Sequence, residues 1–280
     1  MSSILTNNGA MVALQTLKSV NDDLGKTQTS ISTGKEVGSA KDNSAVWAIS
    51  KTMESDIAGF EAIEEGLSIG EATVAVASAG AEQIVEKLTE MKELIVSAQS
   101  ENVDHEKIQT DITSKVEQIT SIIDAAQFNG ANLLKATVDG TATGLGVLAS
   151  LDRVGAGGAV SAVEISVASV DFETDLDLGS MTQITDSASA ASALGEIETY
   201  LQTAITGAAS LGADAARLED QSEFVSNLVD SMTLGVSTMT DTNMEEASAR
   251  LSALQTQQDL ATQSLTIANE APSSLLQLFR

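Results

Sequence analysis

Few residues in this chain have side chains that could carry out chemistry, and they are scattered. Histidine occurs once, at His105, and cysteine is absent. A catalytic or metal-binding histidine needs a partner nucleophile or a second ligand, and no cysteine is available to supply either. Because His105 falls in a predicted break between two helices, we expect it to be exposed to solvent and to have no catalytic role.

One short stretch resembles part of a nucleotide-binding loop. Gly25-Lys26-Thr27 has the residue types that end a phosphate-binding loop. That loop also needs a glycine five residues earlier, where this chain has Val20, and it must not lie inside a helix. Both conditions fail, so we expect no phosphate-binding site here.

Acidic residues form two further patterns that could carry chemistry. The alternating run Asp171, Glu173, Asp175 and Asp177 could supply calcium ligands, but the glycine position of an EF-hand loop is Leu176. The solvent-facing side of a β-strand explains the alternation better. Adjacent pairs such as Glu64-Glu65 lie on predicted helices and point to different faces, so they cannot act as an acid/base couple. We therefore expect a protein that is not an enzyme and has no cofactor or metal.

The composition favours long helices over a thick globular core. The 280 residues include seven aromatic side chains and one proline, Pro272, where average usage predicts about fourteen prolines. Proline breaks helices because it removes a backbone donor and clashes with the preceding turn. With so few aromatics, the core must consist mainly of Ala, Leu, Ile and Val.

The net charge of −26 is unevenly distributed along the chain. It argues against nucleic acid as a partner, because phosphates would be repelled. Residues 1–51 hold five lysines and four acids, and residues 247–280 hold two arginines and two acids. An acidic, solvated middle explains part of this pattern. We further interpret the near-neutral ends as surfaces buried against other chains.

No feature predicts contact with a membrane or a signal for general secretion. No apolar run approaches the ~18 residues of a membrane-spanning helix, and there is no basic amphipathic face. The first twenty residues lack the basic start and apolar stretch of a signal peptide.

Both ends carry the apolar spacing of a coiled coil, in which every third or fourth residue faces a partner helix. The N-terminal seam ends near Gly34, and the C-terminal seam begins near Ala247. Ala, Thr and Gln dilute both seams, so these helices need partners for stability. The large seam residues are the predicted subunit interface: Leu17, Leu24, Ile31, Leu251, Leu254, Leu265, Leu275 and Phe279.

The region between the seams is predicted to be helical with one β-rich interruption. We expect one or two helices over 41–97, with Ile84, Leu88, Met91 and Ile95 on one face. A break at 100–104, a helix from there to Gln127, and helix again from Ser187 should follow. Phe128-Asn129-Gly130 should end the second helix in a left-handed turn. Two valine-rich runs, 145–151 and 163–170, predict β-ribbons. The fold class is mainly α: a long antiparallel helical bundle and coiled coil with a small mid-chain β-hairpin.

Several motifs in this order resemble bacterial flagellin. Residues 29–50 read TSISTGKEVGSAKDNSAVWAIS and are similar to the flagellin N-terminal signature. Phe128-Asn129-Gly130 followed by Leu133-Leu134 resembles the F-N-G-x-x-L-L of that family. Residues 241–280 have the acidic start, the Gln-rich helix, the S-L-x-x-A-N motif and the terminal L-x-L-F-R. The chain departs from the signature at Gly38, where asparagine is common, and at the large Trp47.

The resemblance implies a short flagellin without variable outer domains. The implied division is an inner coiled coil (1–42 and 241–280), an outer helical bundle (43–135 and 187–240) and a β-rich insert (136–186). It further implies an extracellular filament subunit for swimming motility, exported unfolded through the flagellar type III apparatus. The implied partners are copies of itself, that apparatus with a chaperone, and hook-associated proteins. A hook–filament junction protein, which shares both termini, is the alternative.

Overall fold

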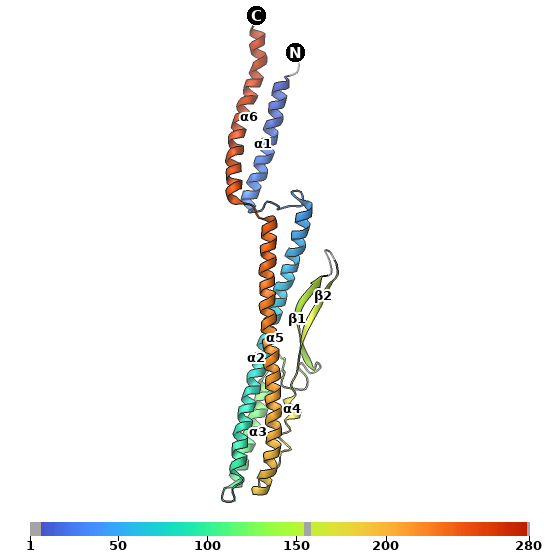
Figure 1. The fold of residues 1–280 in the computed structure, drawn as a ribbon, viewed down its shortest axis with the longest axis vertical. Coiled ribbons are helices and arrows are strands. Elements are labelled where there is room, and N and C mark those ends of the chain that lie inside the picture. Colours follow the sequence, from blue (N-terminus) through green and yellow to red (C-terminus); the bar gives the residue numbers. More distant parts are fainter. Residues whose placement is uncertain (1–6, 154–157, 279–280) are drawn as a thin grey trace. The chain divides into compact units, whose positions relative to one another are not determined.

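The computed structural model describes residues 7–153 and 158–278, and within them the chain is mostly helical (Figure 1). This confirms the predicted class, with one antiparallel hairpin between helices. The elements are α1 (Asn8–Thr33), α2 (Ser44–Ser97), α3 (His105–Ala125), β1 (Gly144–Arg153), β2 (Val160–Ala168), α4 (Phe172–Asp175), α5 (Ser187–Thr240) and α6 (Met244–Leu278).

The chain divides into two compact units. Unit 1 comprises Met1–Asp56 and Ser231–Arg280, and unit 2 comprises Ile57–Asp230. Unit 1 therefore contains α1, α6, the start of α2 and the end of α5. The five-segment division drawn from the sequence stays a prediction.

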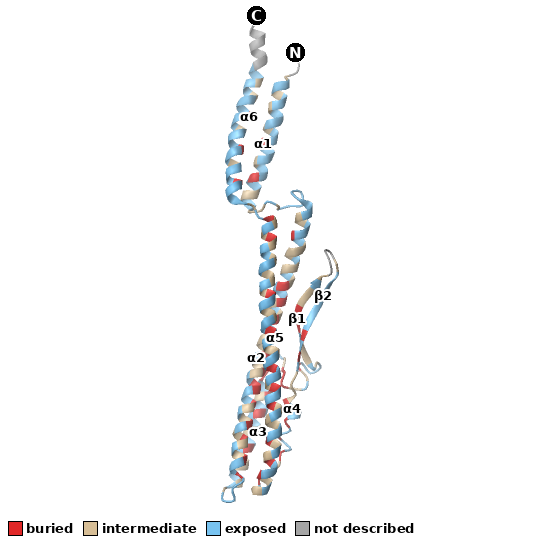
Figure 2. Cartoon of the chain, in the orientation of Figure 1, coloured by how far each residue is buried: buried red, intermediate tan, exposed pale blue. Residues whose placement is uncertain are grey.

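The core of unit 2 lies between α2, α3 and α5 (Figure 2). The α2 side chains expected to share one face, Ile84, Leu88, Met91 and Ile95, are all fully buried. They recur at the three- and four-residue spacing of one helix face, which confirms that prediction. Across elements, Lys92 of α2 binds Glu198 of α5 at 2.8 Å.

Capping side chains mark both ends of α3. Asp104 accepts a hydrogen bond from the backbone N–H of Lys107, as expected for a helix start at this break. The helix ends at Ala125, two residues before the predicted end at Gln127. The Asn132 side chain donates to the Ile123 carbonyl at 2.7 Å and so satisfies a carbonyl at the end of the helix.

The predicted left-handed turn at Phe128-Asn129-Gly130 is confirmed. Asn129 and Gly130 both have positive φ, 50° and 85°, and a β-bridge joins Phe128 to Ala131. Asparagine and glycine are the residues that adopt this conformation most readily.

The hairpin is longer at the turn end than the sequence predicted, and it packs on the helices of unit 2. Its strands pair from Gly144↔Ala168 to Arg153↔Val160, whereas the predicted runs were 145–151 and 163–170. The pairing is interrupted between Leu148 and Ser150. At this interruption the Ala149 carbonyl accepts a hydrogen bond from Gln221 of α5 at 2.8 Å. The β-bulge at Ala149 thus directs the carbonyl of this residue toward α5.

Two sequence predictions in unit 2 are wrong. The acids at 171–177 do not alternate along a strand: Asp171 caps the short helix α4, accepting from the Thr174 N–H at 3.0 Å. His105 is only half-exposed, and its Nε2 lies 2.9 Å from the Ala98 carbonyl. In both cases a nearby backbone group, which the residue pattern does not reveal, binds the side chain.

Candidate assembly interface

Helices α1 and α6 pack side by side in unit 1 and run antiparallel (Figure 1). The Asn7 side chain donates to the Ala268 carbonyl at 2.6 Å, and Gln258 donates to Asn21 at 2.7 Å. Residue numbers thus rise along one helix as they fall along the other, as the sequence predicted.

The predicted seams are the least exposed faces of these two helices. Val20 and Thr27 of α1 and Ala247, Leu254 and Ala261 of α6 are buried. The seven-residue spacing within each helix is that of an antiparallel coiled coil. Alanine and threonine at these positions let the two helices approach closely.

The predicted interface residues lie on these seams where the structure describes them. Leu254 is buried, while Leu17, Leu24, Ile31, Leu251 and Leu265 are half-buried. Leu275 belongs to α6, but its side chain and the whole of Phe279 lie outside the described residues. Within one chain the described members of this set lie between α1 and α6, and a role in contacts between subunits stays a prediction.

Off the seams, both helices expose large apolar side chains that the sequence reasoning missed. Met11, Val12 and Leu14 of α1 are 57%, 64% and 57% exposed. Leu260 and Ile267 of α6 are 56% and 68% exposed. A helix that packs against a single partner is expected to carry polar residues off its seam. Apolar residues at these off-seam positions were the feature of the sequence that could have revealed this surface.

A groove of about 480 Å³ lies between α1 and α6. Its lining includes the exposed side chains of Val12 and Leu260, the buried Val20 and several small residues. None of its described lining residues is charged: Gly9, Val12, Ala13, Thr16, Val20, Gln257, Leu260, Ala261, Ser264 and Ala268.

A backbone clasp joins the two loops at the base of the α1–α6 pair. The Gly34 carbonyl accepts from the Thr242 N–H at 2.9 Å, and the Thr240 carbonyl accepts from the Glu36 N–H at 2.7 Å. A β-bridge pairs Lys35 with Asp241 between these bonds. Gly34 has φ 71°, so the residue that ends α1 also turns the chain into the clasp.

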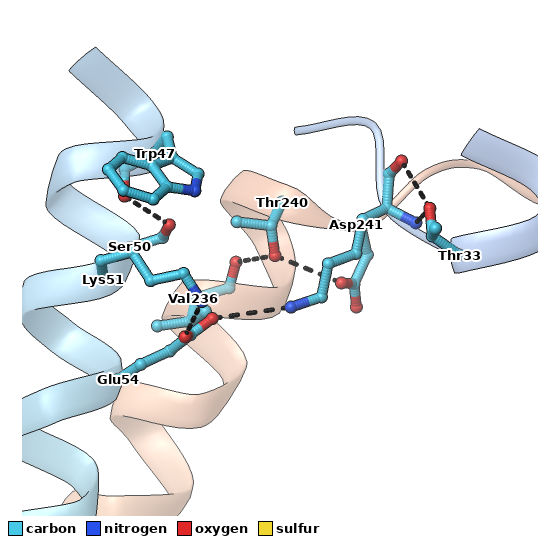
Figure 3. A network of polar contacts seen from close by, with 9 residues as sticks. Thr33, Trp47, Ser50, Lys51, Glu54, Val236, Thr240 and Asp241 are labelled. Atoms are coloured by element: carbon cyan, nitrogen blue, oxygen red, sulfur yellow. Dashed lines mark hydrogen bonds and ion pairs between the residues drawn. The ribbon is translucent and has the colours of Figure 1, made fainter. Parts of the chain in front are cut away.

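Charged side chains reinforce this clasp (Figure 3). Glu54 of α2 binds Lys51 at 2.5 Å and Lys35 of the clasp at 3.5 Å. The hydrogen bond from Lys51, with the positive charges of Lys51 and Lys35, lowers the pKa of Glu54. The Thr240 hydroxyl is buried and donates to the Val236 carbonyl. These contacts position helices and do not assemble a catalytic group.

No arrangement for chemistry is found in the part of the chain that the structure describes. Within it, no three His, Asp or Glu side chains are grouped to hold a metal ion. An open hollow of about 1110 Å³ in unit 2, between α5 and residues 169–175, contains the Lys92–Glu198 ion pair and several hydroxyl groups. None of the described helices is long and apolar enough to cross a membrane.

Paired terminal helices with exposed apolar flanks are typical of a protein that associates with other chains. Family models match both ends of the chain: the bacterial flagellin N-terminal helical region over residues 4–139 and the C-terminal helical region over residues 194–279. The chain belongs to the bacterial flagellin family. It is a structural subunit of the flagellar filament, where copies of one chain polymerise.

Full-length relatives agree with the family models. The chain is 40% identical to a flagellin of Brucella melitensis biotype 1 over 285 residues, covering 100% of both chains. It is 37% identical to flagellin FljM of Caulobacter vibrioides over 283 residues, covering 100% of this chain and 99% of the other. With flagellin A of Rhizobium meliloti it is 32% identical over 395 aligned positions, covering 100% of both chains. None of these matches favours the hook–filament junction alternative.

Proposed function

We propose that this chain is a non-enzymatic subunit of the extracellular flagellar filament and that it polymerises through the exposed flanks of the α1–α6 pair. The observation that carries the proposal is the set of five large apolar side chains on these two helices, each more than half exposed. Exposed apolar surface of this kind often marks an interaction site.

The distribution of charge supports the same surface. Unit 1 holds seven basic and eleven acidic side chains, a net charge of −4, whereas unit 2 holds seven and twenty-nine, a net charge of −22. Like charges repel when copies pack closely, so the nearly neutral unit is the one suited to dense contacts. The acidic unit keeps its charge best where water can solvate it.

Export unfolded through the flagellar type III apparatus, with a chaperone, is part of this proposal. The chain has no cysteine, so disulfide formation would not delay folding after export, and its single proline leaves one bond that could isomerise slowly. Hook-associated proteins are the partners proposed at the filament ends. We propose no nucleic-acid or membrane partner.

A C-terminal truncation tests the proposal. Removing residues 251–280 deletes most of α6 and leaves unit 2 intact. Purified full-length protein, seeded with filament fragments, is expected to form filaments in electron micrographs, and the truncated chain is not. Circular dichroism of the truncated chain should still report a cooperative helical melt. Normal filaments from this variant would contradict the proposal.

A further inference from the structure

The exposed apolar side chains of α1 lie on two different flanks of that helix. At ~100° of rotation per residue, Leu14 lies ~100° and Met11 ~160° from the seam residue Ala13 in one direction. Val12 lies ~100° from Ala13 in the other direction. Met11 and Leu14, 57% exposed each, therefore form a ridge on the flank away from the groove that Val12 borders.

The groove between α1 and α6 lies on the Val12 flank. On α6, Leu260 and Ser264 line it one turn apart, and Ile267 extends the same apolar stripe. Glycine, alanine and serine in its lining leave room for side chains of another molecule. Since its described lining carries no charge in a chain of net charge −26, the surface fits an apolar, uncharged occupant.

We infer that the Met11–Leu14 ridge of one copy docks into the α1–α6 groove of a second copy. The ridge is itself apolar and exposed, and Lys18, one turn beyond Leu14 on the same flank, limits it to the start of α1. The ridge therefore matches the groove in chemistry and needs no partner of another kind. This inference rests on the proposed function and names the contact that builds the polymer.

Two unlike surfaces would allow association to continue beyond a dimer. Ridge and groove are different parts of one chain, so each copy offers one of each. A contact between unlike surfaces is heterologous, and when its rotation does not close a ring it repeats as an open helical polymer. A dimer that paired two identical surfaces would instead use up its binding site and stop growing.

Cysteine cross-linking tests this contact directly, because the chain has no cysteine of its own. One variant carries Leu14→Cys and a second carries Ser264→Cys, and the two are copolymerised and mildly oxidised. A disulfide between them can only join different copies, and it requires close Cα atoms. We expect this cross-linked dimer in the polymer and not in the mixed monomers.

Thr266→Cys provides the matched control. Thr266 is exposed like Ser264 and lies two residues further along α6, on the face away from the groove. Leu14→Cys copolymerised with Thr266→Cys should give little of the dimer. Polymer in which both pairs cross-link equally would overturn the inference and leave the proposed function intact. Wild-type protein that fails to polymerise would refute the proposed function itself.

A second pair of variants decides the matter if a cysteine variant does not polymerise. Ser264→Phe fills the groove, and Thr266→Phe adds the same side chain outside it. Seeded growth of Ser264→Phe should be slower by about tenfold or more, because the ridge would then have to displace a packed ring. Growth of Thr266→Phe should match the wild type. Equal growth of both variants would overturn the inference.

Discussion

Replacing Gly207 of α5 by alanine adds one methyl group and tests how closely the segment after β2 packs against α5. At Gly207, a Cβ atom would lie 2.6 Å from Cγ1 of Val170 and 2.7 Å from Cζ of Phe172. Phe172 is fully buried, and its backbone N–H donates to the Leu134 carbonyl at 3.1 Å. Phe172 cannot move aside without disturbing the core, whereas Val170 is half-buried.

Gly212 on the same helix gives the control, because a Cβ there meets nothing within 4 Å. Alanine is favoured over glycine in a helix by about 1 kcal/mol, so Gly212→Ala should raise the free energy of unfolding by about that amount. Gly207→Ala makes the same gain, but overpacking costs about 1–3 kcal/mol. The two variants should therefore differ by about 1–3 kcal/mol, with Gly207→Ala the less stable.

Urea denaturation of the monomer, followed by far-UV circular dichroism, measures this difference. For a unit of this size, each kcal/mol corresponds to about 2–4 °C in Tm, so thermal melts give an independent check. The urea m-values of both variants should match the wild type, because the surface exposed on unfolding is unchanged. If Gly207→Ala proves as stable as Gly212→Ala, the close packing against α5 is wrong.

Two further predictions concern charge and the terminal helices. Hydrogen bonds from Lys115 and then from Lys87 lower the pKa of Glu90 below its ordinary value of 4.5. The ionised carboxylate therefore stabilises the folded state above pH 4.5, and this stabilisation is lost as pH falls through the lower pKa of the folded state. From about pH 5 to pH 3, Glu90→Gln should lose less stability than the wild type or the exposed control Glu82→Gln in denaturant titrations; equal losses would refute this. Separately, trypsin should cut the monomer near Lys35 and Arg250 and leave a resistant middle, while the filament resists at both sites, because the diluted seams need neighbouring subunits. Protected ends in the monomer, seen by mass spectrometry, would count against that reasoning.

The helices themselves were predictable because their signals are local. The buried positions of α1 and α6, such as Val20 and Leu254, fall on the seams that the spacing of apolar residues predicted. Gly34 ends α1 and Asp104 begins α3, as glycine and aspartate commonly do. Both kinds of signal act between residues a few positions apart, so no knowledge of the rest of the fold was needed.

The contacts between distant segments could not be read from the sequence. Gly59 and Gly70 of α2 look like weak points in a helix, but a Cβ at either would lie 2.7 Å from a side chain of β1. Only the packed hairpin shows that the missing side chains of these glycines leave space for Leu151 and Val147. In the same way, the acids after β2 alternate like a strand, and Asp171 caps a helix instead.

The sequence by itself determined the class of protein, because apolar spacing, terminal motifs, the single histidine and the absence of cysteine do not depend on packing. Tertiary structure decided which apolar side chains α1 and α6 bury in each other and which they leave exposed. A seam needs only the period of a helix, whereas a groove requires two helices at a fixed distance and register. Met11 and Leu260 are apolar residues off the seams in the sequence, and the packed pair of helices leaves both of them more than half exposed.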